Sequence, residues 1–567
     1  MTVAVPRSLA EALREAEEFG ARRVAALDRA EEFPEQACEL LDALGVAQWY
    51  VPARFGGALT DHSGLIRVVR AVAGRDLTTA VAHAKTFLGA ASVFVAAQEA
   101  DAAPADVDRA RWLGAQVRDG LVVSWGLTER EHGSDLLAGE LTATPDACGY
   151  RLNGAKWLIN NATRSGAICL LARTSPGGGA RGFSLLLVDK RRLAPGSYRC
   201  LPKVPTHGVR GADISGIAFT DALVPANALV GRPGTGLETV LKALQLTRTV
   251  ATALSLGAID HALRLTLGYL SERELYGHRL IELPHVRRTL GEVTAGLFVA
   301  ESLTMFVGRA VHTLPGELSV YSAAAKAYVP ALADELIATC AELLGAQAFL
   351  SDVYEYGAYQ KLQRDHRIVG IFDGNVFVNQ SALINQFARL AAGWRRQRCD
   401  EDGVRTAADL AAPLPETGRL ELISRRGCSL MQGFPGTVDA LRAAGAPPRV
   451  AALAAQILGW SADLHTELGA LPPQGTGASP ESFALAYRYQ LCLAAAAATT
   501  IWLANRHGQA QPWWQGALWL EAALTLLADR LAPPGNQPDP RPFDRLADCL
   551  TVGRPIGLDA DARESIR

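Results

Sequence analysis

The stretch Gly126-Leu127-Thr128-Glu129-Arg130-Glu131-His132-Gly133-Ser134-Asp135 follows Leu121–Trp125, an apolar run that is typical of a β-strand. A turn with Thr and Gly-Ser at these offsets can bring backbone N–H groups and two hydroxyls close to a flat polar ligand or a phosphate. Taken alone, the stretch fits a plain turn between two strands equally well. Four motifs further along the chain bear on this choice.

These motifs are Asn153-Gly154-Ala155-Lys156-Trp157-Leu158-Ile159-Asn160-Asn161, Arg273-Glu274-Leu275-Tyr276-Gly277, Arg364-Asp365 and Ile371-Phe372-Asp373-Gly374-Asn375. In this order and at these separations, the set resembles the acyl-CoA dehydrogenase family of flavoproteins. The similarity covers roughly residues 30 to 393 and includes non-catalytic stretches such as Val51–Gly57. The remaining C-terminal residues lie outside it.

The composition limits the possible functions. With 567 residues, 49% of them hydrophobic and 20% charged, the chain can bury several cores and by length should hold about three or four domains. A net charge of -2 with interspersed signs gives no basic stripe, so nucleic acid is not an expected partner. The nine cysteines contain no Cys-x-x-Cys pair, which predicts reduced thiols and no metal site.

The N-terminus has a charged helical pattern rather than a signal peptide, which predicts a cytoplasmic protein. The most apolar stretch, Leu491–Ala504, is shorter than the roughly 20 residues that a membrane span needs. We therefore expect a buried helix there and no membrane span. Tryptophans nearby could form a groove for a partner or contact a membrane surface, but bundle packing is the favoured interpretation: Trp502, Trp513, Trp514 and Trp519.

Changes in hydrophobic periodicity suggest four segments. Residues 1–120 have helical spacing and form an N-terminal helical domain. Residues 121–235 contain short β-rich runs between Gly and Pro clusters, which predict a small central β-barrel or sandwich: Leu121–Trp125, Ala167–Ala172, Phe183–Val188 and Ser215–Phe219. Residues 236–393 return to long helical patterns that suggest a C-terminal four-helix bundle, and 394–567 hold a linker, Cys399–Gly418, and an extra helical domain. The predicted fold class is mainly α with a central β-domain, acyl-CoA dehydrogenase-like, plus this extra domain.

The chemistry that the resemblance implies needs a cofactor. Removing hydrogens from the α and β carbons of a thioester requires a base and a hydride acceptor, and no side chain can accept a hydride. The resemblance implies FAD, with the Leu127 backbone and the Thr128 hydroxyl as flavin contacts. It also implies that Ser134 lies near the phosphates of the flavin or the substrate.

Further cofactor contacts follow from the other motifs. The family usually has an aromatic residue and then a hydroxyl residue against the flavin, and these positions hold Leu158 and Asn160. Trp157 is offset by one, which turns it to the other face of a strand unless a bulge intervenes. Arg273 matches the arginine that reaches the FAD pyrophosphate of a neighbouring subunit, which implies a homodimer or homotetramer, and Tyr276 and Asn375 complete the predicted set. Glu342 replaces the glutamine common near the FAD adenosine.

Asp373 occupies the position of the family's common catalytic glutamate, eight residues after Asp365 and directly before Gly374. The resemblance implies that it is the general base, with a structural role as the alternative. The lost methylene retracts the carboxylate by roughly 1.5 Å, and a misplacement of that order can cost about a hundredfold in rate. The family's other base position holds Thr247, which carries no carboxylate. Predicted substrate contacts are Ser134, Phe372, Gly374 and Arg248.

Three functional classes remain. The first is an FAD-dependent acyl thioester dehydrogenase that acts on an acyl-CoA or an acyl-carrier protein in a specialised bacterial pathway and passes electrons to an electron-transfer flavoprotein. The second is an oxygen-using flavoenzyme, an oxidase or monooxygenase, since related branches keep the flavin pocket while losing the glutamate. The third is a non-catalytic acyl-binding scaffold, for which the change at Glu342 is the only sign.

Overall fold

The computed structural model describes residues 8–177, 179–472, 477–507, 509–533 and 539–559. The chain forms two compact units. We call Ala16–Thr60 with Asp76–Thr247 the mixed unit, and Met1–Glu15 with Asp61–Arg75 and Arg248–Arg567 the helical unit. The long helix α7, Gly236–Glu272, carries the chain from the first to the second. The division into four segments stays a prediction.

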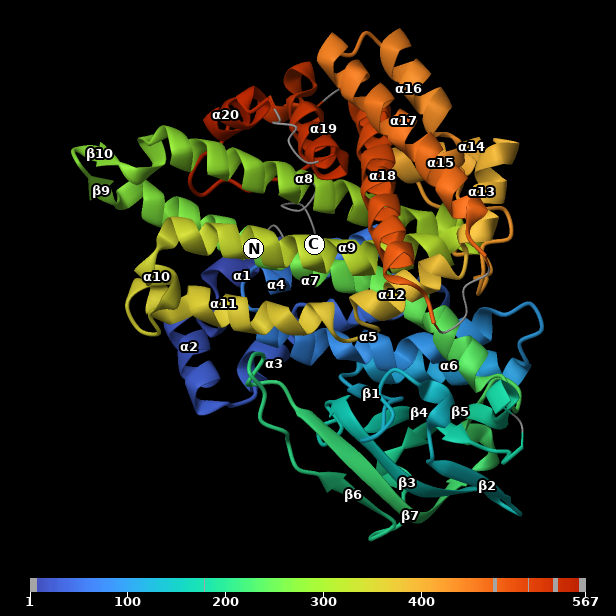
Figure 1. The fold of residues 1–567 in the computed structure, drawn as a ribbon. Helices are drawn as coiled ribbons and strands as arrows, with labels where there is room; N and C mark the ends of the chain where they lie inside the picture. The colour runs from blue at the N-terminus through green and yellow to red at the C-terminus, as the bar shows by residue number, and fades with distance from the viewer. Residues whose placement is uncertain (1–7, 178, 473–476, 508, 534–538, 560–567) are drawn as a thin grey trace, which may run out of the picture. The chain divides into compact units, whose positions relative to one another are not determined.

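The mixed unit contains the α-helices α2 Ala21–Ala30, α3 Glu35–Ala43, α5 Leu77–Gln98 and α6 Pro104–Arg118, together with the first turns of α7. The most buried is α5, whose start is fixed by the Asp76 carboxylate, which accepts the Thr79 N–H at 2.9 Å. Because its apolar residues surround the helix, α5 packs against α3 and α6 as well as against the sheet. Figure 1 shows α5 beside strand β1.

The strands of the mixed unit join in one sheet: β1 Val123–Gly126, β2 Thr142–Asp146, β3 Gly149–Asn160, β4 Ala167–Arg173, β5 Phe183–Asp189, β6 Tyr198–Leu201, β7 Ile214–Pro225 and β8 Leu229–Val230. The order is β6-β7-β3-β2-β4-β5-β8, and β1 pairs with β4 in parallel register. Side chains from β2, β3, β4, β5 and β7 share a single core cluster. The expected central β-domain is therefore confirmed.

An irregularity near the end of β3 bears on the sequence analysis. Trp157 pairs with Gly216 of β7 and Ile159 pairs with Ser215, so Leu158 is the extra residue of a β-bulge. Its φ of 56° lies in the left-handed region, and its side chain is 46% exposed. The sequence analysis placed Trp157 on the other face of the strand unless a bulge intervened, and such a bulge is present directly after Trp157.

The helical unit contains the long helices α8 Pro284–Thr313 and α9 Leu318–Leu344. Shorter helices pack in the same unit: α1 Leu9–Glu15, α4 His62–Ala73, α10 Ala346–Phe349, α11 Ala358–His366, α12 Val376–Ile384 and α13 Phe387–Arg396. The Arg70 side chain of α4 is fully buried and binds Asp260 of α7 at 2.7 Å and Glu301 of α8 at 2.8 Å. A planar guanidinium can pair with both carboxylates at once, so one side chain links three helices. The mainly α class with a central β-domain is confirmed.

The C-terminal residues add more helices to this unit: α14 Glu401–Ala408, α15 Ser429–Gln432, α16 Phe434–Ala443, α17 Pro448–Ala470, α18 Pro480–Asn505, α19 Leu518–Leu531 and α20 Arg541–Asp548. The sequence analysis predicted a linker over Cys399–Gly418. The structure corrects this prediction, because part of the segment forms the helix α14. Arg309 of α8 donates to the α14 carbonyls of Thr406 and Ala407 at 3.1 Å, which ties this segment to the bundle. Figure 1 shows α18 crossing α8 and α9.

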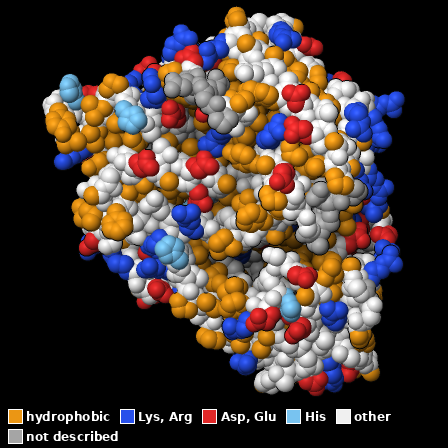
Figure 2. Space-filling model, viewed as in Figure 1, with side chains coloured by type: hydrophobic (Ala, Val, Ile, Leu, Met, Phe, Trp, Pro, Cys, Tyr) orange, Lys and Arg blue, Asp and Glu red, His pale blue; other side chains and the backbone are white. Residues whose placement is uncertain are grey.

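The apolar residues of this region are interior. Leu491–Ala498 of α18 are 0% exposed, as expected for a buried helix. Trp513 and Trp519 pack on Phe298 of α8 with ring centroids 5.8 and 6.0 Å apart, which agrees with bundle packing. Two helices, α5 and α8, are long and apolar enough to cross a membrane, but 78% and 94% of their most apolar windows are buried. Figure 2 shows acidic and basic side chains interspersed on the viewed face.

Docking of α20 on α8 can be tested at a glycine. A Cβ on Gly291 of α8 would overlap the backbone carbonyl of Phe543 in α20. We expect Gly291→Ala to lower the free energy of unfolding by about 1–3 kcal/mol and to increase hydrogen exchange in α20. The control is Gly459→Ala in α17, where a Cβ meets nothing within 4 Å, so better helix propensity should stabilise the protein by up to about 1 kcal/mol. Equal effects of the two substitutions in urea denaturation would contradict this packing.

Candidate functional site

The first group of predicted site residues lies around the loop after β1 in the mixed unit. Lys156 of β3 donates from Nζ to the Leu127 carbonyl at 3.0 Å and to Glu129 Oε1 at 2.8 Å. Glu129 also accepts the backbone N–H groups of Glu140 and Leu141 at 2.7 and 3.0 Å. The loop is thus fixed to the centre of the sheet on both sides of Thr128.

The Lys156–Glu129 pair is largely excluded from water, with Lys156 1% and Glu129 8% exposed. Burial acts to raise the pKa of Glu129, but the Lys156 charge and the hydrogen bonds to the carboxylate outweigh it, so the net pKa lies below its usual value. The Glu129 carboxylate therefore stays charged at neutral pH. Burial lowers the pKa of Lys156, while the Glu129 charge and its hydrogen bond act in the opposite direction. Neither was singled out in the sequence analysis, although a Glu and a Lys of opposite charge in two β-motifs were a signal that they could pair.

Thr128 is bonded to β3 in both directions. Its hydroxyl donates to the Trp157 carbonyl at 2.8 Å, and its own carbonyl accepts the Trp157 N–H at 3.0 Å. The hydroxyl oxygen can still accept a hydrogen bond from a ligand. The Arg130 guanidinium covers the Trp157 ring at 4.5 Å from its centroid, which holds the residue that precedes the bulge.

Asn160 is the most informative of the predicted contacts in this unit. Its side-chain oxygen and nitrogen are both buried, and neither has a hydrogen-bond partner in the protein. The indole nitrogen of Trp125 on β1 is in the same condition. Because unsatisfied buried polar groups are costly, each of these groups indicates a polar ligand or water. Ser134, by contrast, is exposed.

The second group of predicted residues lies in the helical unit, around Asp373. The Asp373 backbone has a φ of 56°, and its carbonyl accepts a hydrogen bond from Arg248 Nε of α7 at 2.9 Å. Its carboxylate Oδ2 is buried without a hydrogen-bond partner. Burial lowers the pKa of Arg248 to about 10, while the Asp373 carboxylate acts in the opposite direction. The structure thus brings the predicted base and the predicted substrate contact Arg248 together.

The neighbours of Asp373 are held by α9 and α12. Lys326 of α9 donates to the Val369 carbonyl at 2.7 Å and lies 5.3 Å from the centroid of the Phe372 ring. Asn379 Nδ2 donates to the Gly374 carbonyl at 2.7 Å. Asn375, a predicted cofactor contact, accepts the Val378 N–H at 2.9 Å with its side-chain oxygen. That oxygen caps α12, which is a structural task that a ligand contact would have to share.

Arg273 and Tyr276 are away from these residues in the fold, at a small hairpin of β9 Glu274–Leu275 and β10 His278–Arg279. Tyr276 is 95% exposed with a φ of 54°, and Arg273 is also exposed. Among the described residues, neither side chain forms a hydrogen bond or an ion pair with the residues around Asp373. Because Arg273 and Tyr276 are exposed, their side chains can contact another molecule. Glu342, near the end of α9, is exposed, and Thr247 is fully buried.

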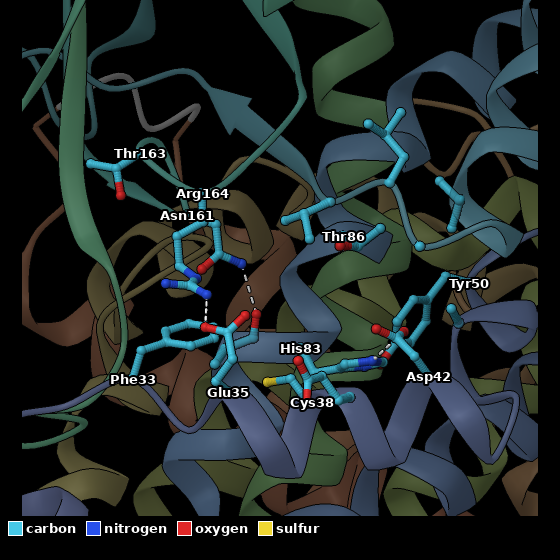
Figure 3. Close-up of a pocket in the computed structure, with 17 residues that line it drawn as sticks. Phe33, Glu35, Cys38, Asp42, Tyr50, His83, Thr86, Asn161, Thr163 and Arg164 are labelled. Atoms are coloured by element: carbon cyan, nitrogen blue, oxygen red, sulfur yellow. Dashed lines mark hydrogen bonds and ion pairs between the residues drawn. The ribbon is translucent and has the colours of Figure 1, made fainter. Parts of the chain in front are cut away.

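A separate cavity of about 520 Å³ lies in the mixed unit, between α3, α5 and the residues that follow β3. Figure 3 shows Asn161 and Arg164 on one side and Tyr50 and Asp42 on the other. His83 of α5 links Tyr50 Oη at 2.7 Å to Asp42 Oδ1 at 3.0 Å. The carboxylates of Glu35, Glu39 and Asp42 line this cavity, so it does not suit the phosphates of FAD or coenzyme A.

Two residues that line this cavity nevertheless hold the end of strand β3, which carries Asn160. Asn161 Nδ2 donates to the Ala82 carbonyl of α5 at 2.7 Å. Arg164 forms an ion pair with Glu35 and covers the Phe33 ring at 3.7 Å from its centroid. These bonds tie the end of β3 to the N-terminal helices. Within the described ranges, no three His, Cys, Asp or Glu side chains are placed to hold a metal ion.

Comparison with known proteins adds a family assignment. Residues 124–222 match the acyl-CoA dehydrogenase middle domain, and 234–386 match the acyl-CoA dehydrogenase C-terminal domain. A probable acyl-CoA dehydrogenase of Mycobacterium bovis is 27% identical over 359 residues, which are 63% of this chain and 89% of the relative.

Two solved structures share the fold. Butyryl-CoA dehydrogenase from Megasphaera elsdenii aligns with a TM-score of 0.59 at 22% identity, covering 68% of this chain and 100% of that one. The prolyl acyl carrier protein oxidase AnaB aligns with a TM-score of 0.57 at 19% identity, covering 64% and 96%. In each case about a third of this chain has no counterpart.

The buried pair gives a stability prediction. We expect Lys156→Met to lower the free energy of unfolding by about 3–5 kcal/mol, because Glu129 loses its counter-charge in the interior. The control is Lys156→Met combined with Glu129→Gln, which should recover part of this loss because no buried charge remains unpaired. Urea denaturation followed by circular dichroism measures both.

The same pair predicts a pH dependence. Because the pKa of Glu129 in the folded protein lies below its ordinary value of 4.5, the stabilising contribution of this carboxylate is present above about pH 4.5 and is lost as the pH falls through the pKa of the folded protein. The stability difference between the wild type and the double variant should shrink over that acidic range. A difference that is independent of pH would mean that the charge of Glu129 contributes nothing.

Proposed function

Because the chain belongs to the acyl-CoA dehydrogenase family and has an additional C-terminal helical region, we propose that it is an FAD-dependent oxidoreductase that desaturates an acyl thioester between its α and β carbons. The observation that carries the proposal is the Asp373 turn, where a carboxylate with a buried, unpartnered oxygen lies beside Arg248. A base needs a free lone pair aimed at its substrate, and Oδ2 has one.

The residues of the mixed unit fit a flavin. The orphaned amide of Asn160 offers one acceptor and two donors, which suits the ring edge of an isoalloxazine with its alternating N–H and C=O groups. The Thr128 oxygen can accept one more hydrogen bond, and the loop that carries Leu127 is held rigid by Lys156. When bound, FAD supplies the acceptor for the β-hydride. We assign Leu127, Thr128, Leu158 and Asn160 to the flavin, and Ser134 to the phosphates of the flavin or the substrate.

In the helical unit, Asp373 removes the α-proton onto its carboxylate. The backbone N–H of Asp373 polarises the thioester carbonyl, which makes the α-proton more acidic. Arg248 holds the Asp373 carbonyl and Asn379 holds the Gly374 carbonyl, so the turn keeps one conformation. Phe372, kept in place under Lys326, excludes water from the reacting thioester.

Self-association follows from the exposed hairpin. We propose that Arg273 and Tyr276 reach the cofactor of a neighbouring subunit in a homodimer or homotetramer. Exposed apolar side chains of the same unit support an interface, because Phe349 is 87% and Val353 65% exposed. A single monomeric species in sedimentation velocity at micromolar concentration would refute this proposal. Asn375 completes the proposed cofactor contacts of the unit.

Membership of the family also suggests how the acyl group is carried and which protein accepts the electrons. The acyl group is carried on coenzyme A or on an acyl-carrier protein, and an electron-transfer flavoprotein receives the electrons, in the cytoplasm and within a specialised bacterial pathway. We also keep the four-segment division at residues 120, 235 and 393.

A second candidate, an oxygen-using oxidase or monooxygenase, has a specific observation in its favour. Leu158 replaces an aromatic contact and lies 46% exposed on the bulge, and a carrier-protein oxidase shares the fold. A non-catalytic scaffold is the third candidate. The three classes differ in cofactor content, in reduction by substrate and in reaction with air.

The cofactor is tested first. The purified protein should show a flavin absorption spectrum, and Asn160→Ala should lower FAD affinity by about tenfold because one polar edge is lost. Asn227→Ala, an exposed amide elsewhere in the mixed unit, serves as the control and should leave affinity unchanged. Anaerobic bleaching by an acyl-CoA or acyl-carrier thioester supports the dehydrogenase, and rapid reoxidation by air supports the oxidase. A protein that never takes up FAD would leave only the scaffold.

The base is tested by substitution. Asp373→Asn should lower kcat by about 10² to 10⁴-fold, because the amide cannot accept the α-proton. Asp373→Glu keeps the carboxylate and should stay within about a hundredfold of wild type. Asp439→Asn, an exposed carboxylate of α16, is the matched control. Full activity in Asp373→Asn would show that another group removes the proton.

A further inference from the structure

A second cavity, of about 200 Å³, lies in the helical unit near the start of the chain. It is bounded by α1, the end of α4, the middle of α7 and residues 553–556. Leucine and alanine side chains form part of its wall, and the charged groups are almost all arginines. It shares no residue with the Asp373 turn or with the hairpin of Arg273, so the proposed dehydrogenation does not account for it.

The charges of this cavity do not balance. The wall carries Arg14, Arg70, Arg75, Arg264 and Arg554 against one carboxylate, Asp260. That carboxylate is already engaged, because Arg70 binds both of its oxygens, at 2.7 and 2.9 Å. Arg75, Arg264 and Arg554 have no other carboxylate on the described wall. The Glu355 carboxylate, which acts on Arg75 and Arg264, is not part of that wall. A concave site with an excess of one charge concentrates ions of the other sign.

Arg75 is the residue on which the inference rests. Its Nε is buried and has no hydrogen-bond partner. A buried donor without a hydrogen bond costs free energy, so such a group is a sign of a missing ligand or water. Burial, followed by the charges of Arg264 and Arg14, lowers the pKa of Arg75 to about 10, and the carboxylate of Glu355 acts against this. The guanidinium groups thus lie close enough to repel one another.

Like charges held together in this way become favourable when an anion lies between them. A guanidinium presents a planar fork of N–H groups that matches the oxygens of a phosphate or a carboxylate. The cavity of about 200 Å³ can hold one such group, with its leucine side chains against an apolar part of the molecule that carries the group. We propose that this arginine pocket binds a small oxyanion of the phosphate or carboxylate type, held by Arg75 and Arg264.

The test uses the purified full-length protein, saturated with FAD where it takes up the cofactor. Sodium phosphate is titrated at constant ionic strength, with sodium chloride in its place as the reference, by calorimetry and by thermal unfolding. We expect saturable binding of one phosphate per chain and a rise in Tm that chloride does not give. Absence of any saturable phosphate effect beyond that of chloride would overturn the proposal.

Three variants locate the site. Arg75→Gln and Arg264→Gln should each weaken phosphate binding by at least about tenfold. Without phosphate, Arg75→Gln should unfold at the same or a higher temperature than wild type, because charge repulsion is relieved, while the phosphate-dependent rise in Tm disappears. Arg405→Gln removes one exposed arginine of α14 that is paired with Asp402, and it should bind phosphate as wild type does. An equal loss in Arg405→Gln would mean nonspecific attraction and would refute the site.

The source of the oxyanion is separated by the same titration with acetate and with adenosine 3′,5′-bisphosphate. Tight acetate binding that Arg75→Gln abolishes identifies a carboxylate. Tight bisphosphate binding that Arg75→Gln abolishes identifies a phosphate group of a larger molecule. Binding of either that persists unchanged in Arg75→Gln and Arg264→Gln places the anion elsewhere and contradicts the proposal.

Discussion

One buried ion pair organises the candidate flavin site, because Lys156 of β3 binds both the Leu127 carbonyl and the Glu129 carboxylate. Taking two charges out of water is costly, and a pair of apolar side chains could be equally stable. Unlike apolar side chains, the ion pair forms directional hydrogen bonds. These bonds fix the loop at two points, one on each side of Thr128. A bulge then follows in the same strand, so Asn160 is presented by a backbone that is held on both sides.

The sequence predicted the elements whose pattern is local. Apolar runs such as Ala167–Ala172 and the long helical repeats were found because a few neighbouring residues define their periodicity. β2 was missed because Pro145 and Asp146 are unusual in a strand. The segment that became α14 was interpreted as a linker from its charge, yet its Val404 and Ala407 are buried against α8. Burial by a distant helix cannot be seen in the segment itself.

The same limit applies to the site. The resemblance named the residues, but it could not give their bonds: Arg248 and Asp373 are separated by 125 positions and meet through the fold. Lys326 and Asn379, which hold the turn around Asp373, were not singled out because nothing in their local sequence indicates it. The N-cap formed by Asn375 could have been predicted from the sequence, since an Asn directly before an apolar helix is a common N-cap.

The geometry of the Asp373 turn gives a physical reason for the shortened base. Asp373 and Gly374 both have a positive φ, of 56° and 90°. Most residues pay about 1–2 kcal/mol for the left-handed conformation, but Asp tolerates it better because its short side chain can bond locally. A glutamate would reach about 1.5 Å further at the expense of more strain in the turn. Aspartate is therefore the carboxylate that this backbone accepts with less strain. In the proposed mechanism, the substrate's α-carbon lies closer to the turn than a glutamate would require.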